Sequence, residues 1–121
     1  MDDSRTATQT GDVLHTTRNG ISATGVYDGE KFEVLEGSEI NLTKKCSLER
    51  YNQQRQKLQD QNSIAEKDGK YILNITLDFK TPSGASDFVL GGSTNGWVEW
   101  KNKDGKTLDE IFRKQKGNSS T

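Results

Sequence analysis

The side chains with the most evident chemistry lie close together near the C-terminal end of the sequence. Trp97 follows an Asn95-Gly96 pair, and the next nine residues contain Lys101, Lys103 and Lys106. Lysine ammonium groups neutralise phosphates, and an accessible indole can stack on a nucleobase. The cluster therefore predicts contact with nucleic acid. The alternative is that the tryptophan packs in the core and the lysines are ordinary surface charge.

A helix start adds a hydroxyl group to this set. Thr81-Pro82-Ser83 is typical of an N-cap followed by a first-turn proline, and the free N–H groups of such a start can hold a phosphate. Capping alone explains Thr81 and Pro82, which leaves Ser83 for a ligand. The residues predicted to contact nucleic acid are Ser83, Asn95, Trp97, Lys101, Lys103 and Lys106.

The residues that usually carry catalysis or bind metal are scarce. The one histidine, His15, lies in the polar N-terminal tail, and the one cysteine, Cys46, stands alone in the sequence, so a nucleophile held beside its base is not expected. The two residues cannot supply a tetrahedral zinc site unless carboxylates do most of the ligation. We therefore predict that the chain is not an enzyme and uses no metal and no cofactor. Four glutamates spaced three apart are expected to form a solvated acidic edge: Glu30, Glu33, Glu36 and Glu39.

Charge is nearly balanced over the whole chain but not along it. The 121 residues include 17 basic and 18 acidic side chains, whereas strong non-specific DNA-binding proteins are usually much more basic. Residues 21–40 carry a net charge of -4, and residues 41–61 and 101–116 each carry +3. If the two basic segments share a face, they form a phosphate-binding surface; otherwise they are ordinary surface charge.

The length allows one domain. Residues 1–20 are rich in threonine and poor in large apolar side chains, which predicts a disordered polar tail, with a folded domain over 21–117 and a second tail over 118–121. No stretch is apolar enough to span a membrane and no secretion signal begins the sequence, so we expect a cytoplasmic monomer.

The domain is expected to open with a β-hairpin. Residues 21–27 and 30–35 alternate apolar and polar side chains around Asp28-Gly29, which favours a two-residue type I′ turn pairing Tyr27 with Glu30. In this register Gly25 faces Phe32 and leaves room for its ring.

Further elements follow from spacing and capping signals. Residues 47–61 predict a glutamine-rich helix, 70–80 a strand, 81–91 a short helix, 97–101 a strand, and the capping box from Thr107 to Glu110 a last helix. The predicted fold class is α+β: a small single domain with an N-terminal β-hairpin and further antiparallel strands, packed with about three short helices.

Several segments in this order resemble the family of domains of unknown function DUF4357. They are residues 23–27, 32–38, 79–83, 89–101 and 104–108, with Asn-Gly-Trp-x-x-Trp-Lys and Gly-Lys-Thr-Leu the most specific parts. The chain departs from the family pattern at Gly84 and Ser86, where alanines are common.

The resemblance implies an accessory role. Members of the family often stand beside GIY-YIG-type nuclease domains or in restriction-related proteins. The Gly-Trp-x-x-Trp core is also similar to the restriction enzyme adenine methylase associated (RAMA) domain, which is thought to bind DNA.

Three functions compete at this point. The first is a non-catalytic module that binds DNA, with a nuclease domain as neighbour. The second is a protein-interaction domain that uses the glutamine-rich helix or an open strand edge. The third is a sensor of a small molecule or modified base beside Trp97.

Overall fold

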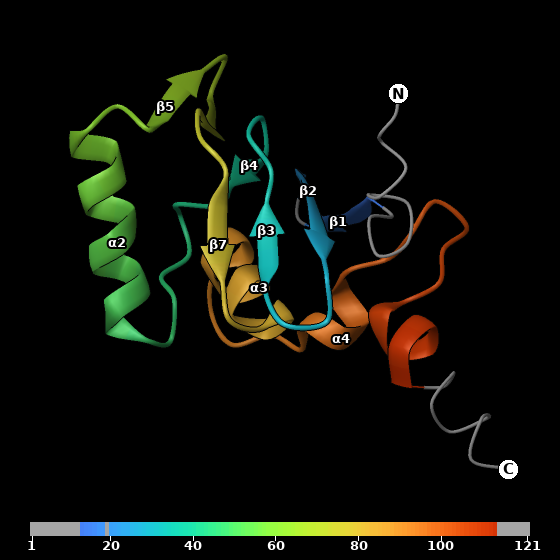
Figure 1. The fold of residues 1–121 in the computed structure, drawn as a ribbon. Helices are drawn as coiled ribbons and strands as arrows, with labels where there is room; N and C mark the ends of the chain where they lie inside the picture. The colour runs from blue at the N-terminus through green and yellow to red at the C-terminus, as the bar shows by residue number, and fades with distance from the viewer. Residues whose placement is uncertain (1–12, 19, 114–121) are drawn as a thin grey trace, which may run out of the picture.

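The computed structural model describes residues 13–18 and 20–113, which form an α+β domain with two antiparallel sheets (Figure 1). The four-stranded sheet has the order β1 (Leu14–Arg18), β2 (Ile21–Tyr27), β3 (Phe32–Val34) and β7 (Leu77–Phe79). The three-stranded sheet has the order β4 (Glu39–Ile40), β6 (Lys70–Leu73) and β5 (Ile64–Lys67). The helical elements are α2 (Glu49–Asp60), α3 (Pro82–Leu90), α4 (Gly96–Glu99) and the π-helical η1 (Asp109–Arg113). The predicted fold class is confirmed.

The core lies between the four-stranded sheet and α3. Phe32 of β3 packs on Trp100 with 4.5 Å between ring centroids, and Phe79 of β7 packs on Phe88 of α3 at 5.2 Å. All four rings are buried, and such aromatic pairs add to the free energy that apolar burial provides. Figure 1 shows α2 beside β7 and η1 at the opposite end of the domain.

The prediction of a disordered tail over residues 1–20 is wrong for Leu14–Arg18. These residues form β1, which pairs with β2 from Leu14 opposite Gly25 to Arg18 opposite Ile21. The other edge of β1 is held by Lys101, because each backbone N–H of His15 and Lys101 donates to the carbonyl of the other at 2.7 and 2.9 Å. The polar composition of residues 14–18 did not indicate this strand, because its order comes from pairing on both edges, with β2 directly after it and with Lys101 far along the chain. Residues 1–12 and the predicted tail 118–121 lie outside the described residues.

The hairpin forms with a different register from the predicted one. Tyr27 pairs with Phe32, so the loop has four residues, and Asp28 Oδ1 accepts from the N–H groups of Glu30 and Lys31 at 2.8 Å each. A shift of two residues keeps every side chain on its predicted face. Gly25 does leave room for the Phe32 ring as predicted, because a Cβ at this position would overlap the ring. Its cross-strand partner, however, is Val34 and not Phe32.

The predicted strand over 70–80 is two strands in different sheets. β6 ends at Leu73, and β7 begins at Leu77 after a break. β6 pairs with β5, a strand the sequence analysis did not predict, across a turn in which Asp68 and Gly69 have φ of 55° and 82°. A break inside a period-two pattern leaves the alternation almost unchanged, which is why the sequence suggested one element.

The helices over 47–61 and 81–91 are confirmed as α2 and α3. Thr81 caps α3, since its side-chain oxygen accepts from the Gly84 N–H at 2.9 Å, and Gly91 ends the helix with a φ of 86°. The predicted capping box at η1 is also present, because Thr107 N–H donates to Glu110 Oε1 at 3.0 Å and Glu110 N–H donates to Thr107 Oγ1 at 3.2 Å.

Candidate nucleic-acid interface

The segment around the two tryptophans is a helix, not the predicted strand. The Asn95 side chain accepts from the Trp97 N–H at 3.0 Å, which makes Asn95 the N-cap of α4. Trp100 follows the last residue of α4 and is completely buried, with its Nε1 donating to the Pro82 carbonyl at 3.1 Å. Periodicity over five residues cannot separate a strand from a helix. In this segment the N-cap at Asn95 favours the helix.

Trp97 is half-buried and packs against the edge of the core. Its ring meets Tyr27 edge to face, with 5.6 Å between the centroids and an angle of 89°. Tyr27 also contacts Phe112 of η1 at 5.2 Å. Part of the indole surface is therefore open to a ligand, while the ring itself is held in place by its aromatic neighbour.

Ser83 holds α3 and α4 together. Its hydroxyl oxygen accepts from the Gly96 N–H at 2.9 Å. A Cβ at Gly96 would overlap the backbone of Pro82 and Ser83, so the first turn of α4 lies directly on the first turn of α3. The side chains of Ser83 and Asn95 thus fix the position of Trp97 by accepting from backbone N–H groups of α4. The sequence had predicted for both residues only a contact with nucleic acid.

The three lysines lie on a compact turn of residues 101–106, called here the lysine turn. Asn102 organises it: its Oδ1 accepts from the N–H groups of Asp104 and Lys106 at 2.9 and 3.0 Å. Its own N–H donates to the Lys106 carbonyl at 2.8 Å, and its carbonyl accepts from Gly105 at 2.9 Å. Asn102 was not among the predicted site residues, although asparagine is typical of such turns.

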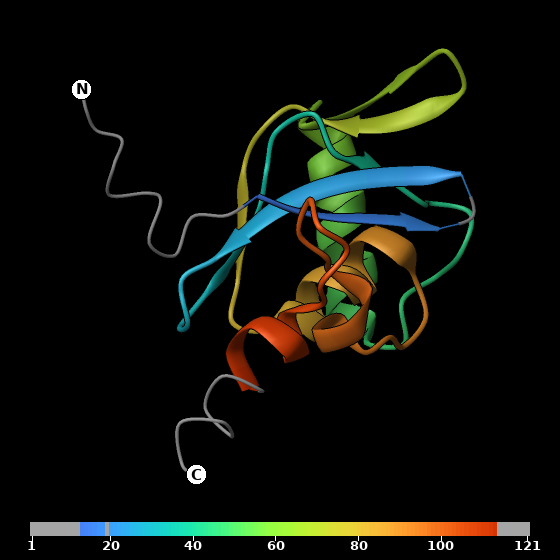
Figure 2. The same ribbon diagram turned by 90° about the vertical axis from the view of Figure 1, so that its right-hand side faces the viewer.

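The charges of the lysine turn point to solvent. The side chains of Lys101, Lys103 and Lys106 are exposed, and none of them forms an ion pair with a carboxylate in the described part of the chain. Figure 1 shows the turn projecting from the domain on the side away from α2, and Figure 2 shows it in front of β1 and β2. Three unpaired cations therefore stand on one protruding backbone segment.

The helical part of the first basic segment does not share a face with the lysine turn. α2, which carries three of the five basic residues of 41–61, lies on the side of the domain away from the lysine turn in Figure 1 and behind it in Figure 2. The condition for one continuous basic surface, that both segments share a face, is therefore not met for α2. Residues 114–116 of the second segment lie outside the described residues.

Arg55 of α2 is a buried cation that sequence reasoning missed. Its Nε and Nη2 donate to the Phe88 carbonyl at 3.0 and 2.6 Å, and its Nη1 donates to the Lys44 carbonyl at 2.7 Å. Burial lowers the pKa of the Arg55 guanidinium, which nevertheless stays charged. Arg55 thus binds the last turn of α3, where the helix dipole favours a cation. Nothing in its neighbourhood along the chain distinguishes it from exposed Arg50.

Cys46 is buried beside α3. Its thiol donates to the Asp87 carbonyl at 3.1 Å, and burial raises the pKa of the Cys46 thiol above its ordinary value. A protonated, buried thiol is a poor nucleophile. Within residues 13–18 and 20–113, no three His, Cys, Asp or Glu side chains gather into a possible metal site.

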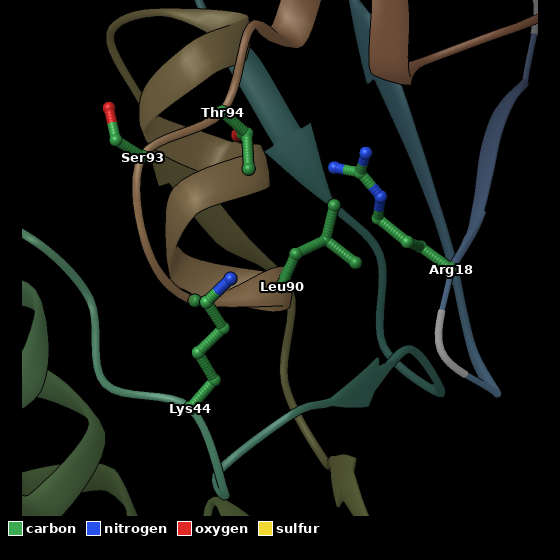
Figure 3. Close-up of a pocket in the computed structure, with 6 residues that line it drawn as sticks. Arg18, Lys44, Leu90, Ser93 and Thr94 are labelled. Atoms are coloured by element: carbon green, nitrogen blue, oxygen red, sulfur yellow. The ribbon is translucent and has the colours of Figure 1, made fainter.

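A polar pocket of about 310 Å³ opens beside the C-terminal end of α3 (Figure 3). Two cations line it, together with Leu90 and the loop that follows α3. The lining residues are Arg18, Lys44, Leu90, Gly91, Ser93 and Thr94. The sequence did not predict this pocket, because its walls come from three separate segments of the chain.

One family of known domains matches most of the chain. The family model of the domain of unknown function DUF4357 matches residues 14–112. This chain belongs to the DUF4357 family. The match begins at the first residue of β1 and ends within η1, so the DUF4357 domain includes the N-terminal strand and the lysine turn. No curated protein and no solved structure matches the chain, and the similarity to the RAMA domain stays a prediction. In the described part of the chain, no helix has the length and apolar character needed to cross a membrane.

Proposed function

We propose that this DUF4357 domain is a non-catalytic module that binds nucleic acid through phosphate contacts of the lysine turn. The observation that carries the proposal is that Lys101, Lys103 and Lys106 are exposed on one hydrogen-bonded turn and form no ion pair with a carboxylate of residues 13–18 and 20–113. Cations already paired within the protein would have to give up those partners before they could release counterions from a phosphate backbone.

The backbone of the lysine turn favours such contacts. Its four hydrogen bonds to Asn102 hold the backbone before a ligand arrives, which lowers the ordering cost of binding. Asp104 is the one carboxylate within the turn, so positive charge prevails locally although the whole chain has a net charge of -1. We therefore expect weak binding, with a Kd of about 10⁻⁵ M at physiological salt.

The exposed part of Trp97 gives this surface a second kind of contact. Base stacking on an aromatic ring contributes about 1–3 kcal/mol per base. The α4 N-cap at Asn95 and the Ser83 contact to Gly96 position the indole for it. DNA is the proposed partner, and a nuclease domain the proposed neighbour that would supply chemistry, since the family resemblance implies both.

Fluorescence anisotropy with a labelled DNA duplex at several salt concentrations tests the proposal. The triple variant Lys101→Gln, Lys103→Gln, Lys106→Gln should bind at least about tenfold more weakly, with the slope of log K against log salt reduced by about 2–3.

A matched control removes the same charge elsewhere. Lys57, Lys67 and Lys80 are exposed lysines with no ion pair to a described carboxylate, and their triple substitution by glutamine should leave most of the affinity intact. Wild-type protein that does not bind, or an equal loss in both triple variants, contradicts the proposal.

A protein-interaction role is the second proposal, and α2 is the observation that favours it. Only Arg55 and Leu58 of this helix are buried, so a broad glutamine-rich face remains on the side away from the lysine turn. For this role, a purified partner should remain bound after nuclease treatment and be released by charge substitutions on α2 rather than on the lysine turn.

A further inference from the structure

The pocket beside α3 brings together two cations that are 26 residues apart in the sequence. Arg18 comes from the end of β1, Lys44 from the segment between β4 and α2, and the wall between them from Leu90 and the loop through Thr94. Figure 3 shows Leu90 between the two cationic side chains. The lining set contains no carboxylate.

Lys44 is held along two glycines. Gly91 and Gly92 have φ of 86° and 72°, and a Cβ at Gly92 would lie 2.9 Å from Lys44 Cε and 3.2 Å from Lys44 Nζ. The stem of Lys44 therefore occupies the space that side chains on this loop would fill. Its ammonium group is placed at the pocket, and it forms no ion pair with a carboxylate among the described residues.

The ammonium group of Lys44 is not among the donors to the carbonyls of Asp87, Phe88 and Val89 at the C-terminal end of α3. The carbonyl of Asp87 accepts from Gly91 at 2.8 Å, that of Phe88 binds Arg55, and that of Val89 accepts from Asn41 at 2.8 Å. Three of the last four carbonyls of α3 are thus satisfied by backbone N–H groups and by a buried guanidinium. Lys44 remains available for a ligand.

Arg18 is only partly engaged. One of its nitrogens, Nη1, binds Glu99 Oε2 at 2.7 Å, and a guanidinium has five N–H donors. Asp87 Oδ1 accepts from the N–H and hydroxyl of Thr94, a lining residue of the pocket, at 2.6 and 2.7 Å. Figure 3 shows the guanidinium turned toward Leu90 and Thr94, whereas the Ser93 hydroxyl points away from both cations.

We infer that this pocket binds a phosphate group, with Lys44 and Arg18 as the charged donors. A tetrahedral oxyanion can accept from two cations on opposite sides at once, and charge-assisted hydrogen bonds of this kind are the strong ones. The volume of about 310 Å³ exceeds what a phosphate alone needs, so an attached sugar also fits, with Leu90 as an apolar contact. The source is either a small phosphorylated molecule or the backbone of a nucleic acid.

The inference does not depend on the lysine turn. Arg18 lies three residues along β1 from His15, the residue paired with Lys101, so about 10 Å of strand separates the two sites. One nucleic-acid strand could reach both sites, but each can bind without the other.

Amide chemical shifts of the full chain, measured by NMR at constant ionic strength, test the inference with three probes. These are inorganic phosphate, ribose 5-phosphate and a thymidine tetranucleotide without a terminal phosphate. We expect saturable shifts at Gly91, Gly92, Ser93 and Thr94. Lys44→Gln should weaken phosphate binding about fivefold, the value of one exposed charge pair, whereas Lys45→Gln should change it less than twofold.

Each outcome has a stated meaning. Shifts that do not saturate, or that are equally affected by Lys44→Gln and Lys45→Gln, overturn the inference. Tighter binding of ribose 5-phosphate than of the tetranucleotide identifies a small ligand, and the reverse identifies nucleic acid.

Two further variants separate this pocket from the lysine turn. Arg18→Gln should also weaken phosphate binding, with amide dispersion reporting that the domain is folded. The triple variant of the lysine turn should bind inorganic phosphate as the wild type does, so either site can fail without the other.

Discussion

At the α2 end of the molecule a cation is buried and satisfied by carbonyl groups, whereas at the lysine turn three cations are exposed and unpaired. Arg55 donates its hydrogen bonds to the backbone carbonyls of Phe88 and Lys44, and so joins α2 to the end of α3. Lys101, Lys103 and Lys106 have no such partners in the described chain. In the sequence, the segments that contain these regions, 41–61 and 101–116, each have a net charge of +3. Positive charge thus supports the fold in one region and is available for a ligand in the other.

Removing the buried cation should have the largest effect. In Arg55→Met the carbonyls of Phe88 and Lys44 lose their donors inside the protein, and we expect a loss of about 3 kcal/mol in the free energy of unfolding. Urea denaturation followed by circular dichroism measures it. Arg50→Met is the control, since Arg50 is exposed and stacks on Tyr51 at 5.1 Å; an equal loss there would contradict the comparison.

The next effect concerns the contact that positions Trp97. Gly96→Ala places a Cβ against the backbone of Pro82 and Ser83, which cannot move aside as a flexible side chain does. We expect about 1–3 kcal/mol of destabilisation, measured by thermal unfolding, with Ser93→Ala as a control of little effect. Unchanged stability would mean that α3 and α4 are not packed as closely as described.

A smaller, pH-dependent effect should come from Cys46. Desolvation by burial raises the pKa of its thiol above 9.0, with Arg55 lowering it and Asp87 raising it to lesser extents. The folded protein therefore holds the proton more tightly than the unfolded chain, and stability should fall as the pH rises above about 9. Urea denaturation at pH 7 and pH 10 measures this, and a fall of the same size in Cys46→Ala would argue against the assignment.

The smallest effect on stability is expected at the lysine turn. Glutamine at Lys101, Lys103 and Lys106 removes no contact within the described chain, so the free energy of unfolding should change by less than about 0.5 kcal/mol. The same denaturation curves that report on Arg55 give this value. A loss comparable to that of Arg55→Met would show that these charges support the fold.

Short-range signals predicted much of this fold correctly. The Thr81 cap, the capping box at Thr107 and Glu110, and the helices α2 and α3 all depend on hydrogen bonds or periodicity within a few residues. The turn at Asp28-Gly29 was located correctly, but its length was not. The side chain of Asp28 holds a four-residue loop instead of the two-residue turn that the dipeptide suggests.

Candidate site residues were less predictable than the helices. Lys101, Lys103 and Lys106 do share one exposed turn, and their closeness in sequence was enough to place them together. Ser83 and Asn95 proved to hold the helices that carry Trp97. The pocket at Lys44 could not be predicted, because its walls come from segments that only the folded chain brings together.

By itself, the sequence determined the helix caps, the α2 and α3 helices, the family and the closeness of the three lysines, since each depends on neighbouring residues. The tertiary structure alone decided that Leu14–Arg18 form a strand, that Arg55 is buried, and that Arg18 and Lys44 line the same pocket. The physical reason is that the pairing of β1 with Lys101 and the burial of side chains depend on partners far along the chain. Identical residue types are exposed or enclosed according to what packs over them.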